Sequence, residues 1–446
     1  MLLMALIFYR ERAFFMDAGF QLFNLINEGT IQIYHHRFVT GIPQILPWLL
    51  LKLGAPLRVL AMSFSASYIL FYLLVYHLLV RYLKNDLLGW TLIFLFTLIS
   101  FDTFYHIQSE FYLGLSLLLL SFGLVLKWPE MKEVRHLSIL LALLVAVGFS
   151  HKLSLIFFVF LWLFFGLTFN ALRHWRYVVL LGAFLAVAAF KSAFFTNWYE
   201  AAKQGEFQSN LEHFFPNLLD IPANLVFLKR CVQYYYLLPI LLLSVSVFYF
   251  LNKKWLKLGL VWVFTPGYLM LYNISDPQAQ YRFYSEVTYL PLTIFVAVPF
   301  LFDVLPEVIS RWPSLEKRVL PLLFAALMLL RLGTIAGNHR TFERQFSWIE
   351  AQLKRSGSYR FLMKKEVAPM DTVMMEWGVP FTAMHLSALA SPDSAKTLLI
   401  LPDFDWYEDK MERTDVFFSP FHKVLEKKDL NPGYYNPPDG RYLLLE

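Results

Sequence analysis

Long apolar runs, separated by short stretches of charged and turn residues, recur along the first three quarters of the chain. About 20 apolar residues in a helix are enough to cross the ~30 Å hydrocarbon core of a bilayer. A series of such runs predicts an all-α polytopic membrane protein, because helices satisfy their own backbone hydrogen bonds in lipid. The expected spans cover residues 57–80, 87–101, 111–127, 137–150, 153–169, 177–195, 231–251, 256–273, 288–305 and 318–336. Reading 137–169 as one long element would change the count by one.

The chain begins with a shorter apolar run, Met1–Tyr9, which is followed by charged residues. Nine residues of helix span only ~14 Å, about half of the bilayer core. We expect this run to be the end of a truncated first helix, and a genuine short anchor is the alternative. With this helix, the expected number of transmembrane helices is about eleven.

The composition is that of a membrane protein. Hydrophobic residues make up 58% of the chain and charged residues only 16%, whereas soluble proteins have about 25% charged residues. The basic residues lie in short loops rather than on one face, so the net charge of +6 does not indicate a nucleic-acid partner. Cys231 is the single cysteine, which excludes an internal disulfide.

Short loops that hold basic residues alternate along the chain with the other set of loops. This alternation predicts the orientation, because cytoplasmic loops are enriched in lysine and arginine. The loops assigned to the cytoplasm hold Arg81, Lys84, Lys127, Lys132, Arg135, Arg173, Arg176, Lys253, Lys254, Lys257, Arg311, Lys317 and Arg318. The outer side then receives residues 10–56, 102–110, 150–152, 196–230, 274–287 and the C-terminal part. These outer loops are longer and hold most acidic and histidine side chains, so we expect function there.

The last quarter of the chain has a different character. Apolar residues at helical spacing predict a helix over 339–355, short apolar runs predict strands over 372–377, 397–401 and 442–445, and a helix is expected around 380–390. We therefore predict two domains. Residues 1–336 form a transmembrane domain with a long first outer loop (10–56) that contains surface helices, and 337–446 form a small soluble α/β domain on the outer face.

Asp17 is the first candidate for chemistry, because it follows the first apolar run and is flanked by Phe14, Phe15, Met16 and Phe20. Apolar surroundings raise the pKa of a carboxylate and make it a better general base. The alternative is that Asp17 simply caps a helix on the membrane surface. Asp102, His106 and Glu110 lie together in the next outer loop.

The order of these features resembles the GT-C superfamily of integral-membrane glycosyltransferases, which includes protein O-mannosyltransferases and the aminoarabinose transferases of lipid A. An acidic residue, Asp17, opens a long first outer loop after the first helix. The loop continues to the proline-rich stretch Gly41–Gly54, and further acidic residues, Asp102 and Glu110, lie in the next outer loop. Many members place two acidic residues side by side in the first loop, whereas Asp17 is followed by Ala18. That departure puts a bound divalent metal in doubt.

The resemblance implies transfer of a sugar from a polyprenyl-phosphate donor to an acceptor hydroxyl, with inversion, at the outer face of a membrane. We expect that membrane to be a bacterial inner membrane with the active site facing the periplasm. The acceptor is a lipid, glycan or protein, and no cofactor is expected. Asp17 and Glu110 are the predicted catalytic residues.

The departing phosphate needs cations near the outer surface. The predicted substrate-binding residues are His36, Arg37, Asp102, His106, His151, Lys152, Lys203, Tyr281, Arg282 and Glu286, and Lys229 and Arg230 are further candidate cations. Arg282, which lies between Tyr281 and Phe283, is placed to hold a phosphate through two hydrogen bonds. The alternative is an interfacial arginine whose charged end reaches the membrane surface, and Lys191 has the same alternative.

His35, His36 and His106 could bind a metal together with nearby carboxylates. However, the spacing matches no common ligand motif, so sugar hydroxyls or interface packing are the preferred interpretation. A transporter or flippase of lipid-linked sugars, a polymerase of surface polysaccharide and a non-catalytic scaffold are the competing functions. A transporter would place ionisable residues deep in its spans, whereas those within the expected spans, such as Lys191, Asp303 and Arg331, lie near the ends.

Overall fold

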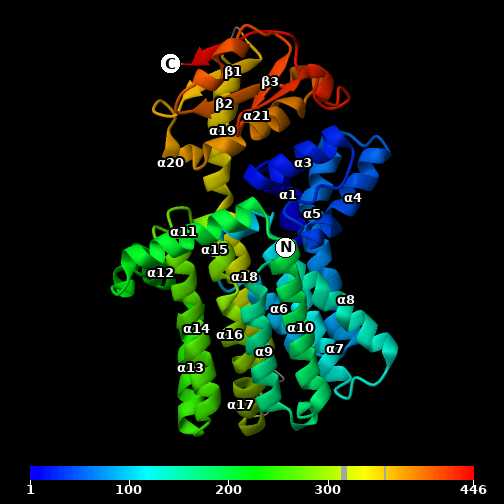
Figure 1. Cartoon of the computed structure of the whole chain (residues 1–446), viewed down its shortest axis with the longest axis vertical. Coiled ribbons are helices and arrows are strands. Elements are labelled where there is room, and N and C mark those ends of the chain that lie inside the picture. Colours follow the sequence, from blue (N-terminus) through cyan, green and yellow to red (C-terminus); the bar gives the residue numbers. More distant parts are fainter. Residues whose placement is uncertain (313–318, 356–357, 446) are drawn as a thin grey trace.

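The chain forms a bundle of membrane-length helices with a small α/β domain at one end (Figure 1). The computed structural model describes residues 1–312, 319–355 and 358–445. Lys317 and Arg318, which were assigned to a cytoplasmic loop, lie outside the described residues.

The bundle has the lengths and apolar character of a helical membrane protein. Within the described residues, six helical segments are long and apolar enough to cross a bilayer, or seven if one pair bent by 91° counts as a single span. These segments are Leu57–Tyr82 (α5 with η2), Glu110–Lys127 (α7), Trp175–Phe194 (α10), Trp255–Ser275 (α14), Arg282–Arg311 (α15 to α17) and Leu320–Leu353 (α18 and α19), and the bent pair is Pro222–Gln233 (α12) and Leu237–Leu251 (α13).

The expected number of about eleven spans is not confirmed, because several of the expected segments form short helices. These are Asp86–Leu95 (α6), Val134–Ser150 (α8) and Ser154–Thr168 (α9), each of 10 to 17 residues. Residues 137–169 do not form one long helix, because α8 ends at Ser150 and α9 begins at Ser154. The N-terminal run forms the short helices Leu2–Ile7 (α1) and Tyr9–Ala13 (α2).

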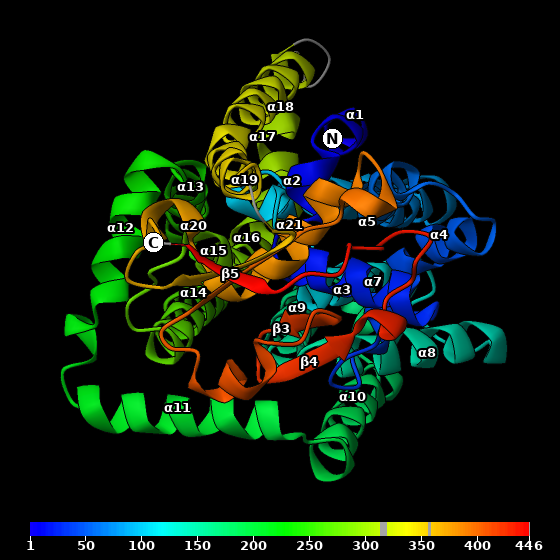
Figure 2. The same ribbon diagram turned by 90° about the horizontal axis from the view of Figure 1, so that it is seen from above.

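The first outer loop contains the predicted surface helices. Met16–Glu28 (α3) and Gly41–Lys52 (α4) lie beside the upper end of α5, and α4 packs closely along α5 (Figure 1). Trp198–Phe214 (α11) runs along one side of the bundle when the molecule is viewed from above (Figure 2). Residues 38–40, between α3 and α4, contact α7 and α8.

Several short turns connect the larger elements. The 3-10 turns of the bundle are Phe38–Thr40 (η1), Asp102–Phe104 (η3), Asn170–Leu172 (η4) and Leu218–Asp220 (η5), and the π-helical turns are Leu78–Tyr82 (η2) and Phe300–Val304 (η6). The span Arg282–Arg311 comprises Arg282–Tyr289 (α15), Leu292–Pro299 (α16) and Leu305–Arg311 (α17) around η6. In the next span, Leu320–Gly337 (α18) leads into His339–Leu353 (α19).

The C-terminal domain is a three-stranded parallel sheet with helices packed against it. The strand order is β2-β1-β5, with Arg360 beside Thr397 on one side and beside Tyr442 on the other. The strands are Arg360–Lys364 (β1), Thr397–Leu401 (β2) and Tyr442–Leu445 (β5), while Val416–Ser419 (β3) and Lys423–Glu426 (β4) form a separate hairpin. Met370–Val373 (α20), Val379–Ala388 (α21) and the 3-10 turns Glu376–Gly378 (η8), Pro392–Ser394 (η9), Asp405–Lys410 (η10) and Lys427–Asp429 (η11) complete it.

Most of the sequence prediction for this domain is confirmed, including α19, α21, β2 and β5. The strand expected at 372–377 is wrong, because this segment forms α20 and the turn η8. The central strand β1 was not predicted. Its apolar residues are only Phe361, Leu362 and Met363 between charged neighbours, and this run is too short to stand out from its surroundings.

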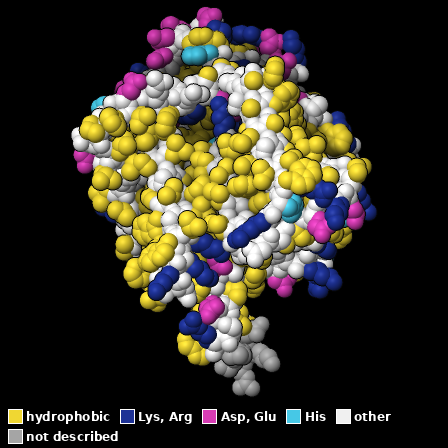
Figure 3. All heavy atoms as spheres, turned by 60° about the horizontal axis from the view of Figure 1, so that its bottom comes forward, with side chains coloured by type: hydrophobic (Ala, Val, Ile, Leu, Met, Phe, Trp, Pro, Cys, Tyr) yellow, Lys and Arg dark blue, Asp and Glu magenta, His cyan; other side chains and the backbone are white. Residues whose placement is uncertain are grey.

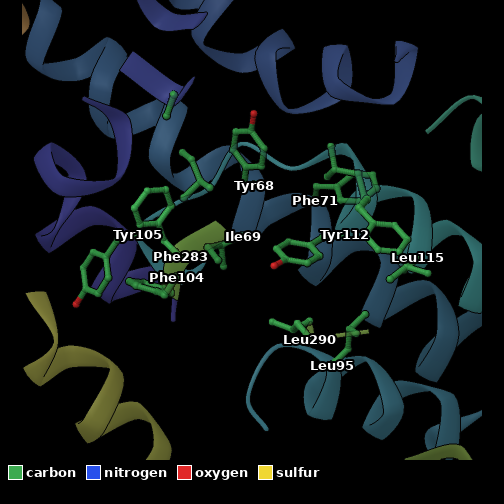
Figure 4. Packing of buried hydrophobic residues seen from close by; sticks show 14 of the residues in the cluster. Tyr68, Ile69, Phe71, Leu95, Phe104, Tyr105, Tyr112, Leu115, Phe283 and Leu290 are labelled. Atoms are coloured by element: carbon green, nitrogen blue, oxygen red, sulfur yellow. The ribbon is translucent and has the colours of Figure 1, made fainter. Parts of the chain in front are cut away.

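One hydrophobic core joins the two parts of the molecule. Buried residues of α3, α5 and α7 contact buried residues of α15, α19 and α21 within the same cluster. Figure 4 shows Phe104 and Tyr105 of the 102–110 loop within this cluster, together with Tyr68, Ile69 and Phe283. The 102–110 loop is therefore fixed by packing from several sides.

The outer surface of the bundle agrees with a membrane environment. Figure 3 shows hydrophobic side chains over much of the lateral surface, with lysine and arginine side chains toward the end opposite the C-terminal domain. Large apolar side chains on α10, α13, α14 and α18 are exposed, as lipid-facing residues are. The molecule is therefore an integral membrane protein by its architecture.

Candidate functional site

Asp17 lies in the first turn of α3, close to the upper ends of α7 and α15. Phe15 occupies the N-cap position and no side chain caps the helix, so Asp17 is not the cap that the alternative interpretation required. Met16, immediately before it, is buried and has a φ of 46°, a left-handed conformation that a non-glycine residue adopts only under constraint. The backbone therefore turns sharply just before Asp17.

Glu110 and Arg37 lie beside Asp17, and the three residues are called the Asp17 cluster below. An ion pair joins the Arg37 guanidinium to the Glu110 carboxylate. The Asp17 carboxylate is 35% exposed, and its Oδ2 lies 3.6 Å from Nε2 of the almost completely buried His106. The Tyr284 side chain lies near the same carboxylate and lowers its pKa. Residues from four distant segments thus meet at Asp17.

These surroundings raise the pKa of Asp17 to about 7. Most of the rise comes from protein atoms that displace water around the carboxylate, and the negative charge of Glu110 adds to it, while Arg37 and the Tyr284 hydroxyl oppose it. Burial lowers the pKa of His106 to about 4, so this imidazole is neutral at pH 7. A carboxylate with a pKa near the working pH is well suited to act as a general base.

A second group of charged side chains lies next to the Asp17 cluster. Lys152 lies just before α9, Lys191 lies in the last turn of α10, and Glu200 lies in the first turn of α11. Lys152 Nζ lies 3.2 Å from one oxygen of Glu200, and Lys191 Nζ lies 3.6 Å from the other. Lys191 is only 3% exposed and its ammonium has no hydrogen-bond partner among the described residues, whereas Lys152 is 40% exposed. Two lysines thus share one carboxylate, which leaves a net positive charge.

His151 connects the two groups. Its ring stacks on Phe111, the residue after Glu110, with ring centroids 4.5 Å apart. The charges of Arg37, Lys191 and Lys152 all lower the pKa of His151, in addition to its burial. Glu110, Arg37 and the lysines therefore surround one small region.

Arg282, Asp102 and Glu286 form a separate set of ion pairs, called the Asp102 cluster below. The Arg282 guanidinium donates two hydrogen bonds to the Asp102 carboxylate, each 2.8 Å long, and another to Asn338. Glu286 is fully buried and accepts hydrogen bonds from the backbone N–H groups of Phe101 and Thr103 and from the Tyr235 hydroxyl. The cluster therefore fixes the 102–110 loop, and direct ligand contacts of Arg282 and Glu286 stay predictions.

The remaining predicted residues lie around the edge of this region. His36 packs against Phe195 and its neighbour His35 stacks on Tyr199, so the two imidazoles point to different partners. Tyr281 packs against Phe283. Lys203 is exposed on α11 and pairs with Glu206.

The other candidate cations differ in their surroundings. Lys229 is exposed on α12, and Arg230 donates to Ser285 and to the backbone oxygen of Ala279. Lys191 does not reach toward water as the interfacial alternative expected, because its ammonium is buried against Glu200.

No group of three or more His, Cys, Asp or Glu side chains in the described part of the chain is arranged to hold a metal ion. Asp17, Glu110 and His106 are close, but the Glu110 carboxylate already forms an ion pair with Arg37. The donor set at Asp17 therefore does not fit a metal in this arrangement.

Sequence reasoning missed Glu200, Tyr284 and Tyr199. Glu200 lies in a polar helix among other charged residues, and only the contact with Lys152 and Lys191 distinguishes it. Tyr284 was visible two residues after Arg282, but an interfacial aromatic residue is common in membrane proteins. The ring of Tyr199 faces Arg37, but no sequence pattern distinguishes this residue from the other tyrosines.

Comparison with protein-family models, with curated proteins and with solved structures finds no match to this chain.

Proposed function

We propose that the protein is a membrane glycosyltransferase that moves a sugar from a polyprenyl-phosphate donor to an acceptor hydroxyl at the outer face of the membrane. The observation that carries the proposal is the Asp17 carboxylate itself. It has a pKa of about 7 and remains partly exposed, and it lies next to a region with excess positive charge from Lys152 and Lys191. A base beside an anion site is what a displacement of phosphate by a hydroxyl requires. The order of outer-loop features that resembles the GT-C superfamily agrees with this proposal.

In the proposed reaction, the acceptor hydroxyl attacks the anomeric carbon of the sugar. A new carbon–oxygen bond forms, the bond between that carbon and the phosphate oxygen breaks, and the sugar inverts. The hydroxyl proton passes to Asp17, and the polyprenyl phosphate leaves with the electron pair of the broken bond. Lys152 and Lys191 stabilise the negative charge of the leaving phosphate.

Each neighbour of Asp17 has a separate part in this proposal. Glu110 keeps Arg37 beside the carboxylate, and its own negative charge keeps the proton affinity of Asp17 high. Neutral His106 and the Tyr284 hydroxyl orient the carboxylate toward the acceptor. We infer that the membrane is a bacterial inner membrane and that this face is periplasmic.

The test compares cells that produce the wild-type protein with cells that produce Asp17→Asn. Lipids, envelope glycans and membrane proteins are extracted and compared by mass spectrometry, and the expected result is a sugar-modified product that only the wild type makes. Asp371→Asn is the matched control, because Asp371 is an exposed aspartate of the C-terminal domain. A product made equally by wild type and Asp17→Asn at similar protein levels would contradict the proposal.

A further inference from the structure

The C-terminal domain is in direct contact with the backbone that carries Asp17. Helix α21 packs along α3, and the turn η8 also touches α3. The contacting residues are more than 350 positions apart in the chain. The soluble domain is therefore not tethered loosely above the membrane helices.

Two side chains of α21 bind backbone oxygens on either side of Asp17. The Thr382 hydroxyl donates to the carbonyl oxygen of Phe14 at 2.6 Å. The imidazole of His385 contacts the carbonyl oxygen of Gly19 through Nε2 at 2.9 Å, and the Tyr435 hydroxyl contacts its Nδ1 at 2.8 Å. Because burial lowers the pKa of His385 to about 4, the ring is neutral. Nε2 therefore carries the proton and donates it to Gly19, and Tyr435 donates to Nδ1.

A third contact joins Gly378 to Met16, the residue in the left-handed conformation. A Cβ atom added to Gly378 would lie only 2.9 Å from the Cα of Met16 and 3.4 Å from its nitrogen. Gly378 has ordinary helical backbone angles, so its conformation does not require glycine. Glycine is required at this position because any side chain would come too close to Met16. Met16 is the residue with φ of 46°, and strained backbone persists only where surrounding contacts hold it.

Aromatic contacts extend the same connection to the carboxylate. The Phe14 ring stacks on His385, with centroids 4.8 Å apart. Trp377, next to Gly378, packs against Phe20 and lies near Tyr284, which itself lies near Asp17. The contacts thus bracket Asp17 from residue 14 to residue 20.

We propose that the C-terminal domain is the positioning device for Asp17: Gly378, Thr382 and His385 hold residues 14–19 in the left-handed turn that directs the Asp17 carboxylate to Glu110, His106 and Tyr284. These are positioning residues, because each acts on the backbone and none faces the carboxylate. The inference deepens the proposed function and rests on it only for the catalytic role of Asp17. The placement of the carboxylate can be measured whether or not sugar transfer occurs.

The experiment measures how readily the Asp17 carboxyl of the full-length protein reacts with dicyclohexylcarbodiimide, an apolar reagent that modifies protonated carboxyl groups. The purified protein in detergent is treated at a series of pH values, and modification of the peptide that contains Asp17 is quantified by mass spectrometry. In the wild type, modification falls as the pH rises through about 7. The charged and titratable groups facing Asp17 are Glu110, Arg37, His106 and Tyr284, and all stay unchanged in the variants.

Gly378→Ala and Thr382→Val are expected to move the midpoint of this profile to lower pH by roughly one unit, because a displaced carboxylate gains water. Thr382→Ser keeps the hydroxyl and restores the wild-type midpoint. Gly205→Ala is the matched control, since no described heavy atom lies within 4 Å of the added carbon. Wild-type profiles in folded Gly378→Ala and Thr382→Val would overturn the proposal.

Folding is checked on each variant by size-exclusion chromatography and thermal unfolding. If Gly378→Ala does not fold, Thr382→Val decides, because valine has the shape of threonine and removes only the hydroxyl, which donates to the carbonyl oxygens of Phe14 and Gly378. Global unfolding of both variants would also overturn the proposal, since these contacts would then support the whole fold rather than one turn.

A transfer assay separates this inference from the proposed function. Gly378→Ala is expected to lower kcat by roughly tenfold or more and to change the donor KM less than twofold, because small displacements of a reacting group slow chemistry more than binding. Full activity of Asp17→Asn would contradict the proposed function and leave the carbodiimide result unaffected.

Discussion

The Asp17 cluster and the Asp102 cluster contain the same kinds of group, two carboxylates and one arginine, and both lie near the end of the bundle that carries the C-terminal domain. In the Asp102 cluster the arginine binds one carboxylate through two hydrogen bonds, and the other carboxylate accepts two backbone N–H groups and a hydroxyl. In the Asp17 cluster the arginine pairs with Glu110. Within the described residues, the one ion-pair contact of Asp17 is with His106, which is neutral at pH 7.

The comparison shows that residue types alone do not distinguish a structural ion pair from a reactive group. The partners of each carboxylate distinguish the two cases. A fully bonded cluster holds a loop in place, whereas a carboxylate left without a strong cationic partner has a raised proton affinity and partial access to solvent.

The largest effect is expected from removing the two aspartates one at a time. Asp17→Asn should lower the rate of sugar transfer by roughly 10²–10⁴-fold, the usual contribution of a general base, and leave the protein folded. Asp102→Asn should instead lower the yield of folded protein. Equal transfer rates per folded molecule in the two variants would remove the distinction between the clusters.

Removing the arginine of the structural cluster should cost stability. Arg282→Ala leaves Asp102 and Glu286 without their cation, and breaking a buried pair in this way costs about 3–5 kcal/mol of unfolding free energy. The loss can be measured by unfolding in sodium dodecyl sulfate. A loss under about 1 kcal/mol, the value of an exposed pair, would show that Arg282 is free to bind a ligand.

Lys152 and Lys203 should differ in anion binding. Lys152→Ala should weaken binding of polyprenyl phosphate by about tenfold, the effect of one charge-assisted hydrogen bond. Binding can be followed by the quenching of tryptophan fluorescence. Lys203→Ala is the matched control, because Lys203 is exposed and pairs with Glu206. A larger effect of Lys203→Ala would place the phosphate on α11 instead.

The smallest effect concerns stability and pH. The pKa of Asp17 is raised from an ordinary value near 3.8 to about 7 in the folded protein. Between these values the folded state binds more protons than the unfolded state, so stability falls as pH rises and stays lowered above pH 7. Asp17→Asn removes this penalty. Its Tm should exceed that of the wild type at pH 8 by on the order of 2–4 °C, and the difference should shrink toward pH 4.

A difference in Tm between the wild type and the Asp17→Asn variant that stays constant from pH 4 to pH 8 would contradict the raised pKa. The expected shift is modest because the carboxylate is 35% exposed, and solvent screens a partly exposed charge.

The sequence was sufficient for the class of fold and for part of the site. Apolar runs and loop charges identified a helical membrane protein with an α/β domain, because membrane insertion depends on local composition. Asp17, Glu110, Arg37 and His106 were all named as candidates and are close together in the structure. The number of spans was not predictable, since short helices such as α6 have the same composition as complete spans.

The rest of the site depends on contacts between distant segments. Nothing in the sequence indicates that Arg282 pairs with Asp102, 180 positions away. The partnership of Glu200 with Lys152 and Lys191 likewise requires the ends of three elements to meet. Side-chain pairing of this kind is set by tertiary packing, so a motif can identify the residue type and miss its partner.

The contact between the first outer loop and the C-terminal domain has a consequence for the order of synthesis. Residues 14–27 leave the ribosome early, but Gly378, Thr382 and His385 follow hundreds of residues later. Asn431, which binds the side chain of Asn27 and the backbone of Ile26, is later still. The nascent chain can therefore insert its helices while the loop around Asp17 has no fixed shape. The loop around Asp17 therefore acquires these contacts only after the residues of the C-terminal domain that hold it have been synthesised.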